Sequence, residues 1–203
     1  MRTELSKVME IIKLGEKLKY ELRHSWLSNG RRESVAEHTW RVALMAVLIS
    51  PKLSVEINME KLLKMIIIHD LVEAEAGDIP AFETLNNASI KSKKRENEIK
   101  AIMNIRDTLG GEVGEEIYEL WMDFEDKASI EAQVANAFDK LEAQIQHNES
   151  DISTWLQIEH SMSFRLGRHC EFSQELVILK DLIQDEAEQK LNKAGIEADR
   201  LKI

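Results

Sequence analysis

The sequence predicts an all-α fold, a single bundle of about seven or eight helices, and three observations favour it. Apolar residues recur with the 3.6-residue period of an amphipathic helix along most of the chain, and no segment shows a convincing strand alternation. Pro and Gly, which interrupt helices, number only 2 and 8 among 203 residues. Several of the periodic segments also begin at a residue type that caps helices well.

The first part of the chain predicts two helices joined by a loop. Residues 4–19 carry one apolar stripe, and the period then breaks in RHSWLSNGRRES, which is typical of a loop. Ser34 and Glu37 form the S-x-x-E pattern of a capping box directly before HTWRVALMAVLI. The second helix is therefore expected to begin after Ser34 and to end before Pro51.

The next segment predicts one long helix followed by a loop. Asn58 can cap MEKLLKMIIIHDLVEAEA, and Gly77 can adopt the left-handed conformation that ends a helix. Residues 79–88, which include Pro80, are expected to form a loop.

The second half of the chain predicts five further helices. They are expected at residues 89–109, ending at Gly110 and Gly111; at EEIYELWMDFED; at IEAQVANAFDKLEAQIQHN, capped by Ser129; and at about 154–166 and 174–193, separated around Gly167. The chain shows no internal repeat, low-complexity tract or Gly/Ser linker, which favours a single domain over residues 1–203.

Composition restricts the classes of partner. Lys and Arg total 27 and Asp and Glu total 37, so the net charge of −10 disfavours broad binding to nucleic acid. The single Cys170 excludes an intramolecular disulfide. The N-terminal segment lacks an apolar core of signal-peptide length, and no stretch approaches the roughly 20 apolar residues that span a bilayer. We expect a cytoplasmic protein without a membrane partner.

One buried segment carries unusually many ionisable residues. His69, Asp70 and Glu73 lie within the apolar run that ends at Gly77. At about 100° per residue, these three side chains share one broad face of a helix. Burying three ionisable groups without compensation would cost several kcal/mol, and a bound divalent cation provides that compensation.

Two further residues can complete a metal site. His38 lies one turn into the capped helix, and Asp139 lies between Ala135 and Ala143, whose small side chains leave room beside the carboxylate. With His69 and Asp70 they would supply two imidazoles and two carboxylates, which suits one divalent ion of Mn, Co, Fe, Zn or Mg. Taken alone, His38 is equally compatible with a core histidine, and Asp139 with an ion pair to Lys140.

The order H…HD…D also resembles the signature of HD-domain metal-dependent phosphohydrolases. The segments ESVAEHTWRVA, HDLVEAEAGDIP, ELWMDFED and DKLEAQIQ are similar to the branch typified by bacterial 5′-deoxynucleotidases. The resemblance covers about residues 15–150, so the HD-domain helical bundle is expected to have its core there and a C-terminal helical extension at 151–203.

The resemblance implies specific roles. It makes His38, His69, Asp70 and Asp139 the metal ligands. It makes Glu73 the carboxylate that orients or deprotonates the attacking water, and Asp78 a second catalytic acid beside substrate and water. Arg23 matches an arginine on the phosphate side of the nucleotide, and Trp26 is a further substrate-binding candidate. Bacterial members carry Trp directly after that arginine, whereas this chain has His24.

The implied activity is a metal-dependent phosphomonoesterase that hydrolyses (deoxy)nucleoside 5′-monophosphates to nucleoside and phosphate. Two alternatives stay open: an HD phosphohydrolase acting on another small phosphate ester or nucleotide, and a nucleotide-binding regulator with little turnover. Residues 71–138 contain no His, which favours one metal ion over two. Relatives of this branch commonly pair, and apolar Leu120, Trp121 and Phe124 are candidates for a homodimer interface.

Other ionisable residues are interpreted without a function. His147, His160 and His169 lack carboxylates at ligand spacing, which indicates surface or helix-end positions. The run KSKKR is interpreted as the solvated start of a helix, although it could also guide an anionic substrate.

Overall fold

The fold is all-α, as the periodicity predicts. The computed structural model describes residues 1–85 and 87–202, and within them seven helices have eleven residues or more. The longer helices are α1 (Arg2–Leu14), α2 (Val35–Ile49), α3 (Met59–His69), α6 (Ala88–Leu109), α7 (Gly111–Asp126), α8 (Ile130–Glu149) and α10 (Gln174–Lys193). The shorter ones are α4 (Glu73–Ala76), α5 (Ala81–Leu85) and α9 (Gln157–Met162).

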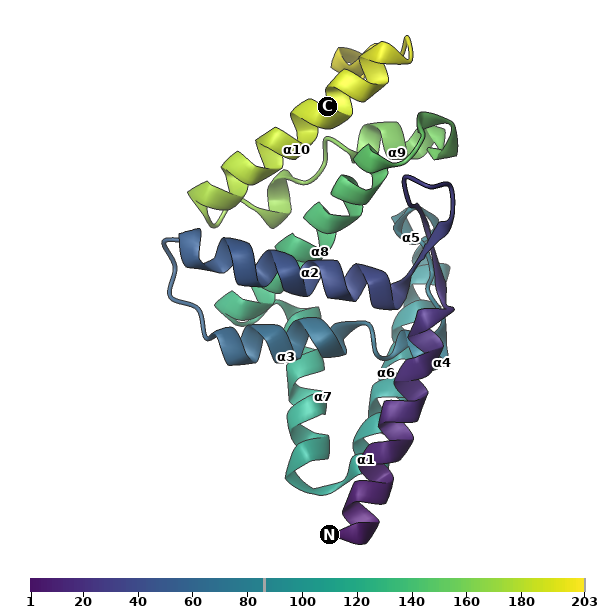
Figure 1. The fold of residues 1–203 in the computed structure, drawn as a ribbon, viewed down its shortest axis with the longest axis vertical. Helices are drawn as coiled ribbons and strands as arrows, with labels where there is room; N and C mark the ends of the chain where they lie inside the picture. Colours follow the sequence, from purple (N-terminus) through teal and green to yellow (C-terminus); the bar gives the residue numbers. More distant parts are fainter. Residues whose placement is uncertain (86, 203) are drawn as a thin grey trace.

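Helices α2, α3 and α8 contact one another at the centre of the fold (Figure 1). Helices α2 and α3 lie side by side, and α8 contacts both of them. Helix α7 packs on α3, α6 and α8, while α1 lies along α6 toward the N-terminal end. At the opposite end α10 packs on α8.

One apolar cluster holds this arrangement together. Leu62, Ile66 and Phe138 are fully buried where α3 meets α8, and Trp121 of α7 closes the same cluster. The cluster extends to Leu176 of α10, so the C-terminal segment shares the main core. Burial of this kind supplies the dominant favourable term in folding.

The expected helix starts are confirmed. The Ser34 hydroxyl accepts a hydrogen bond from the Glu37 N–H, and the Glu37 carboxylate accepts one from the Ser34 N–H, which completes the capping box. Asn58 and Ser129 cap α3 and α8 through their side chains. Gly77 has a φ of 76°, a conformation that side chains other than glycine rarely adopt.

The expectation of a loop at residues 23–34 is wrong. Strands β1 (Leu22–Trp26) and β2 (Arg32–Ser34) form a two-stranded antiparallel hairpin. Its strands are only five and three residues long and largely polar, so they carry little apolar alternation. Gly30, with a φ of 83°, lies in the turn between them.

The long helix expected through residues 59–76 is also wrong, because it breaks at Asp70. In a continuous helix the His69 carbonyl would accept the Glu73 N–H. Instead it accepts a hydrogen bond from Trp121 Nε1 at 3.1 Å, and the Glu73 N–H turns to the Asp70 carbonyl at 3.0 Å. A side chain from α7 therefore accompanies the end of α3 at His69.

Three smaller differences concern element ends. Residues 79–88 contain the short helix α5 where a loop was expected, and α9 is shorter than the expected 154–166. The first helix is α at Arg2–Leu14 and continues as a 3₁₀ turn at Gly15–Lys19. No helix in the described ranges has the length and apolarity needed to cross a bilayer.

Candidate metal centre

The four candidate ligands come together from three helices. His38 lies in the first turn of α2, His69 ends α3 with Asp70 next to it, and Asp139 lies in the middle of α8. Donor atoms of His38, His69 and Asp139 all lie within 4.8 Å of one another. Asp70 completes the group, because its oxygens lie 3.2 Å from His69 Nε2 and 3.8 Å from His38 Nε2.

Both imidazoles present Nε2 to the centre of this group. His69 Nδ1 donates a hydrogen bond to the Ile66 carbonyl at 2.6 Å, and His38 Nδ1 is bonded to the Glu142 carboxylate. His38 Nε2 lies 2.9 Å from Asp139 Oδ1. The carbonyl acceptor fixes the tautomer of His69 and leaves the Nε2 lone pair free to bind a metal.

The residues present fit a divalent metal. His69 Nε2 is buried, and it has no hydrogen-bond partner among the described residues. A buried polar atom without a partner is costly unless something else binds it. Two imidazole nitrogens and two carboxylates form a mixed N/O donor set of the kind that first-row divalent metals accept.

Neighbouring charges keep the Asp139 ligand ionised. Burial alone would raise its pKa, but the permanent positive charges of Lys140 and Arg23 hold the pKa of Asp139 well below its ordinary value. The Lys140 ammonium lies 2.7 Å from Asp139 Oδ2. Asp139 is therefore an anion at neutral pH and can bind a cation through Oδ1.

Two more carboxylates lie beside the ligands. Glu73, the first residue of α4, is buried, and desolvation together with Asp70 and Asp78 raises its pKa well above the ordinary value. Burial also raises the pKa of Asp78. The Lys94 ammonium lies 4.0 Å from the Glu73 carboxylate. Acids with raised pKa values beside a candidate metal site are candidates for proton transfer.

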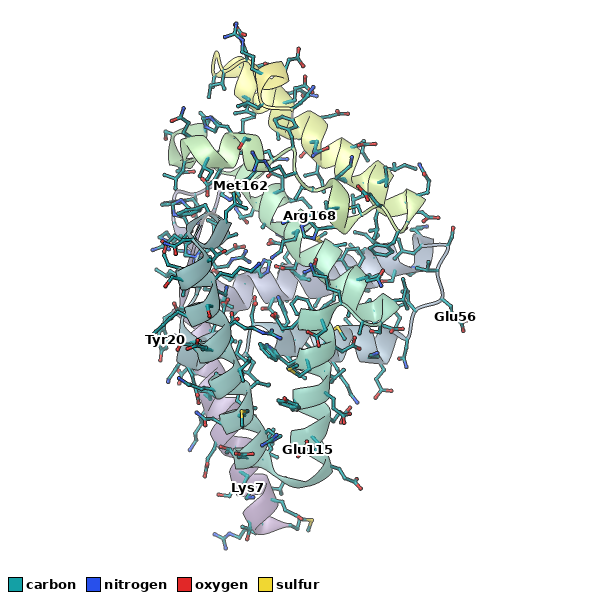
Figure 2. The ribbon with its side chains drawn as sticks, turned by 180° about the vertical axis from the view of Figure 1, so that it is seen from behind. Lys7, Tyr20, Glu56, Glu115, Met162 and Arg168 are labelled. Carbon is teal, nitrogen blue, oxygen red and sulfur yellow. The ribbon has the colours of Figure 1, made fainter. Side chains whose placement is uncertain are left out.

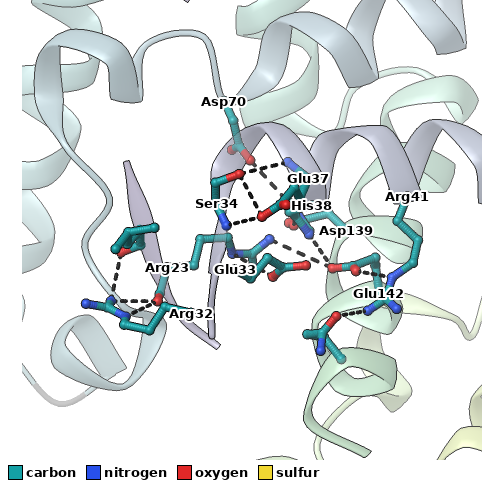
Figure 3. A network of polar contacts seen from close by, with 12 residues as sticks. Arg23, Arg32, Glu33, Ser34, Glu37, His38, Arg41, Asp70, Asp139 and Glu142 are labelled. Atoms are coloured by element: carbon teal, nitrogen blue, oxygen red, sulfur yellow. Dashed lines mark hydrogen bonds and ion pairs between the residues drawn. The ribbon is translucent and has the colours of Figure 1, made fainter. Parts of the chain in front are cut away.

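A buried charge network supports His38 from behind (Figure 3). Arg41 Nε donates to Glu142 Oε1 at 2.6 Å, so Glu142 is held between Arg41 and His38. Arg23 extends from β1 toward the same carboxylate and toward Glu33, at 3.8 Å from each. These contacts are longer than hydrogen bonds, and Arg23 Nη1 has no hydrogen-bond partner within the described chain.

The sequence did not predict a role for Glu142, Glu33 or Arg41. The available signal was weak: Arg41 follows His38 by three residues and Glu142 follows Asp139 by three, which places each pair on one helix face. Nothing local predicts that these faces meet, because residues 41 and 142 belong to separate helices.

Two chambers meet at the metal-binding group. Asp78, Asp139, Lys140 and Arg23 line both of them. The larger, about 310 Å³, is strongly charged and also contains the side chains of Lys91, Lys94 and Arg95. The smaller, about 160 Å³, runs along α8 toward the C-terminal segment.

The residues that line these chambers bear on three interpretations made from the sequence. The run KSKKR is more than a solvated helix start, since Lys94 is partly buried and lies by Glu73. The helix-end position expected for His147 is confirmed, because it lies in the last turn of α8, but its side chain also lines the smaller chamber. Trp26 is absent from the described residues lining either chamber, and its ring instead packs edge-on to His24, at 4.8 Å between centroids.

Comparisons with known proteins point in one direction. A family model described as "HD domain" matches residues 15–178. The chain is 36% identical to 5′-deoxynucleotidase HDDC2 of Dictyostelium discoideum, over 70% of this chain and 76% of that protein. It is 31% identical to 5′-deoxynucleotidase HDDC2 of Danio rerio, over 71% and 70%.

Solved structures agree. A crystal structure described as a predicted metal-dependent phosphohydrolase from Magnetospirillum magnetotacticum has a TM-score of 0.78 and 28% identity, covering 93% of this chain and 97% of the other. A conserved hypothetical protein from Pyrococcus furiosus has a TM-score of 0.61 and 31% identity, covering 85% and 99%.

Proposed function

Because this chain belongs to the HD domain family, we propose that it is a metal-dependent phosphomonoesterase that hydrolyses deoxynucleoside 5′-monophosphates to nucleoside and phosphate. The observation that carries the proposal is that Glu73 lines the same chamber as the candidate ligands His69, Asp70 and Asp139. Relatives at 31% and 36% identity bear the name 5′-deoxynucleotidase, which supports the substrate class.

A divalent metal held by His38, His69, Asp70 and Asp139 would supply a water of lowered pKa and would polarise a phosphate oxygen. The two imidazoles favour Mn, Co, Fe or Zn over Mg. Glu73, the first residue of α4, lines the same chamber and is not needed as a metal ligand.

The remaining polar residues have complementary tasks in this proposal. Glu73 orients the attacking water and takes its proton. Arg23, with its unpaired Nη1 in the described structure, and Lys94 neutralise phosphate charge. Asp78, which lines the same chamber as Glu73, gives a proton to the departing 5′-oxygen of the deoxyribose. Trp26 acts by holding His24 in place.

The test is phosphate release from a substrate panel by metal-loaded protein. We expect turnover of deoxynucleoside 5′-monophosphates, with slower reaction of ribonucleotides, deoxynucleoside triphosphates and unrelated phosphate esters. Removal of the metal by chelation should abolish turnover, and adding back Mn²⁺ or Co²⁺ should restore it. Metal-loaded protein that releases no phosphate from any monophosphate would overturn the proposal.

The same preparation tests the number of metal ions. We expect about one equivalent of transition metal per chain by elemental analysis, because the donor set described above is complete with four residues. Chelation should lower the melting temperature, since a ligand that binds only the folded state stabilises it by mass action. Two equivalents per chain would indicate a dinuclear centre and a different mechanism.

We also propose a homodimer, on different residues from those the sequence suggested. Leu120, Trp121 and Phe124 are buried in the core of a single chain, so they cannot form the interface. Helix α2 instead exposes an apolar stripe opposite its buried face: Trp40, Leu44, Val47 and Leu48. A helix that is apolar all round is normally covered on both sides.

We propose that the protein is a single domain and is located in the cytoplasm. The chain acts as one HD domain, and the C-terminal part beyond residue 150 belongs to it, which the family match to residue 178 and the shared apolar core support. Its compartment is the cytoplasm, where nucleoside monophosphates are formed and where the buried thiol of Cys170 stays reduced.

A further inference from the structure

The smaller chamber extends along one side of α8. It begins at the metal ligand Asp139 and follows α8 through Ala143 to His147. Eight residues of helix at 1.5 Å each give about 12 Å between Asp139 and His147. This is comparable to the length of a nucleoside monophosphate from its phosphate to the far edge of its base.

The walls of this chamber differ from those of the larger one. Phe82 of α5, Ala143 of α8, and Met162 and Leu166 of the C-terminal segment give it apolar sides. Figure 2 shows Met162 at the α9 end of the molecule, next to α8. The larger chamber is lined mainly by charged side chains. A flat heteroaromatic ring is better accommodated between apolar walls.

Three polar side chains close the far end: the buried Glu159 and the partly buried His24 and His147. Glu159 Oε2 accepts the Leu156 N–H at 2.6 Å, which fixes the carboxylate at the start of α9. Its other oxygen, Oε1, lies 3.5 Å from His24 Nε2 and 3.7 Å from His147 Nε2. Both distances are longer than an ordinary hydrogen bond, so this oxygen can still accept one from a ligand.

The two imidazoles are also incompletely bonded. Within the described residues, His24 Nε2 and His147 Nδ1 are buried atoms without a hydrogen-bond partner. Burial lowers the pKa of His147 to about 4 and raises that of Glu159 to about 6. At pH 7.5 the cluster is therefore a carboxylate beside a neutral His147, a combination that can both accept and donate hydrogen bonds.

We propose that the smaller chamber is a nucleobase subsite in which Glu159, His147 and His24 bind the polar edge of the base. The base lies between the apolar walls, and a base N–H donates to Glu159 Oε1. The C-terminal segment, through α9, thereby selects nucleotides from other phosphate esters. This inference rests on the proposed function, since it assigns the part of the substrate beyond the phosphate.

The test compares two substrates that differ only in the base. Deoxyadenosine 5′-monophosphate and 2-deoxyribose 5-phosphate share the sugar and the phosphate, so only the first can use the subsite. Glu159→Gln keeps an acceptor for the Leu156 N–H and removes the charge. Ala143→Leu keeps Glu159 and narrows the chamber. Glu171→Gln, at an exposed position of the same segment, is the matched control.

For Glu159→Gln we expect kcat/KM for the deoxynucleotide to fall about tenfold or more, mainly through KM, because a hydrogen bond to a charged group is lost. Ala143→Leu should lower it by a similar factor. Turnover of 2-deoxyribose 5-phosphate should stay within about twofold in Glu159→Gln, and Glu171→Gln should change neither substrate. An equal fall for both substrates, or no fall for either, would overturn the inference.

Binding of deoxyadenosine separates this inference from the proposed function. Calorimetry on metal-loaded protein should detect the nucleoside, and Glu159→Gln should weaken its binding about tenfold or more. If the nucleoside binds in this way but no phosphate is released from its monophosphate, the proposed function fails and the subsite stands. If phosphate is released equally well with and without a base, the subsite fails and the phosphatase stands.

Discussion

The two histidines of the candidate metal site are held by hydrogen bonds at Nδ1, on the side away from the other candidate ligands. His69 is bonded to a backbone carbonyl of its own helix, whereas His38 is bonded to Glu142, which is itself paired with Arg41. A carboxylate behind a histidine raises the basicity of the ligating nitrogen and fixes the ring. The charges of the network in Figure 3 thus orient His38 before any metal arrives.

A variant at Glu73 can distinguish a loss of metal binding from a loss of proton transfer. If His38, His69, Asp70 and Asp139 hold the ion, Glu73→Gln should leave metal content and helical signal nearly unchanged. Phosphate release from deoxynucleoside monophosphates should fall about 10²- to 10⁴-fold, because general base assistance is lost. Elemental analysis and single-turnover kinetics on the same sample measure both quantities.

Asp139→Ala is the matched comparison for Glu73→Gln. It removes a donor contributed by α8 and should lose metal and activity together. If Glu73→Gln also strips the metal, Glu73 is a ligand and the division of roles is wrong. Full turnover with metal retained would instead move the catalytic base to another residue, with Asp78 next.

His169 gives a pH dependence of stability away from the metal. Burial, together with Lys140, Arg168 and Lys127, lowers the pKa of His169 to about 4. The unfolded value is about 6.5, so the unfolded state binds more protons between pH 6.5 and 4. The contribution of His169 is therefore complete above pH 6.5 and is lost as pH falls through this window.

The measurement is the free energy of unfolding by urea at pH 7.5 and pH 5. His169→Gln can retain the hydrogen bond that His169 Nδ1 gives Asn136, at 2.8 Å, but it cannot titrate. The variant should lose less stability than the wild type on acidification, while other titrating groups cancel in the comparison. Equal losses in the two proteins would show that His169 is protonated normally in the folded state.

At the scale of the helices, the starts could be predicted and one important end could not. Ser34, Asn58 and Ser129 cap their helices through atoms within three residues, so the pattern in the sequence contains all the information. The end of α3 depends on Trp121, which lies 52 residues away along the chain. Periodicity alone therefore extends the helix past Asp70.

The candidate site shows the same difference between local patterns, which can be predicted, and contacts between distant residues, which cannot. The pattern of His38, His69, Asp70 and Asp139 is present in the sequence, and the fold brings these residues within a few ångströms. Glu142 and Glu159 acquire their positions only when α8 packs on α2 and α9 folds back toward β1. No local pattern encodes such contacts.

The capping box of α2 supports a further prediction, because His38 lies one turn beyond it. Ser34→Ala removes the hydroxyl that accepts the Glu37 N–H and should lower the free energy of unfolding by about 1 kcal/mol. Ser92→Ala, at an exposed position within α6, should change it by less than about 0.5 kcal/mol. Urea unfolding of metal-free protein measures both free energies. Equal effects of the two substitutions would show that the Ser34 cap does not stabilise α2.

Across the whole molecule, the metal-binding group joins the helices that form the centre of the core. His38, His69 and Asp139 come from α2, α3 and α8, which also pack on one another through buried apolar residues. Asp70 and Asp139 at this junction repel each other, and a bound cation would offset that repulsion. Binding of a metal and closure of the core therefore favour the same arrangement of the helices.

The outer face of α2 leads to the last prediction, which concerns assembly. Trp40 and Leu48 are 65% and 62% exposed, and with Leu44 and Val47 they follow the i, i+4, i+7, i+8 spacing of one helix face. Exposed aromatic residues at the centre of an apolar patch are frequent anchors of protein interfaces. Two copies that meet through α2 would cover this stripe symmetrically.

We expect a dimer by light scattering at micromolar concentration. Trp40→Glu should shift it to monomer, because a charge would be buried without a partner. Leu182→Glu, at a residue 60% exposed on α10, should leave the dimer intact and controls for a general effect of added charge. A wild type that is monomeric at this concentration would contradict the prediction, and a dimer that survives Trp40→Glu but not Leu182→Glu would place the interface on α10.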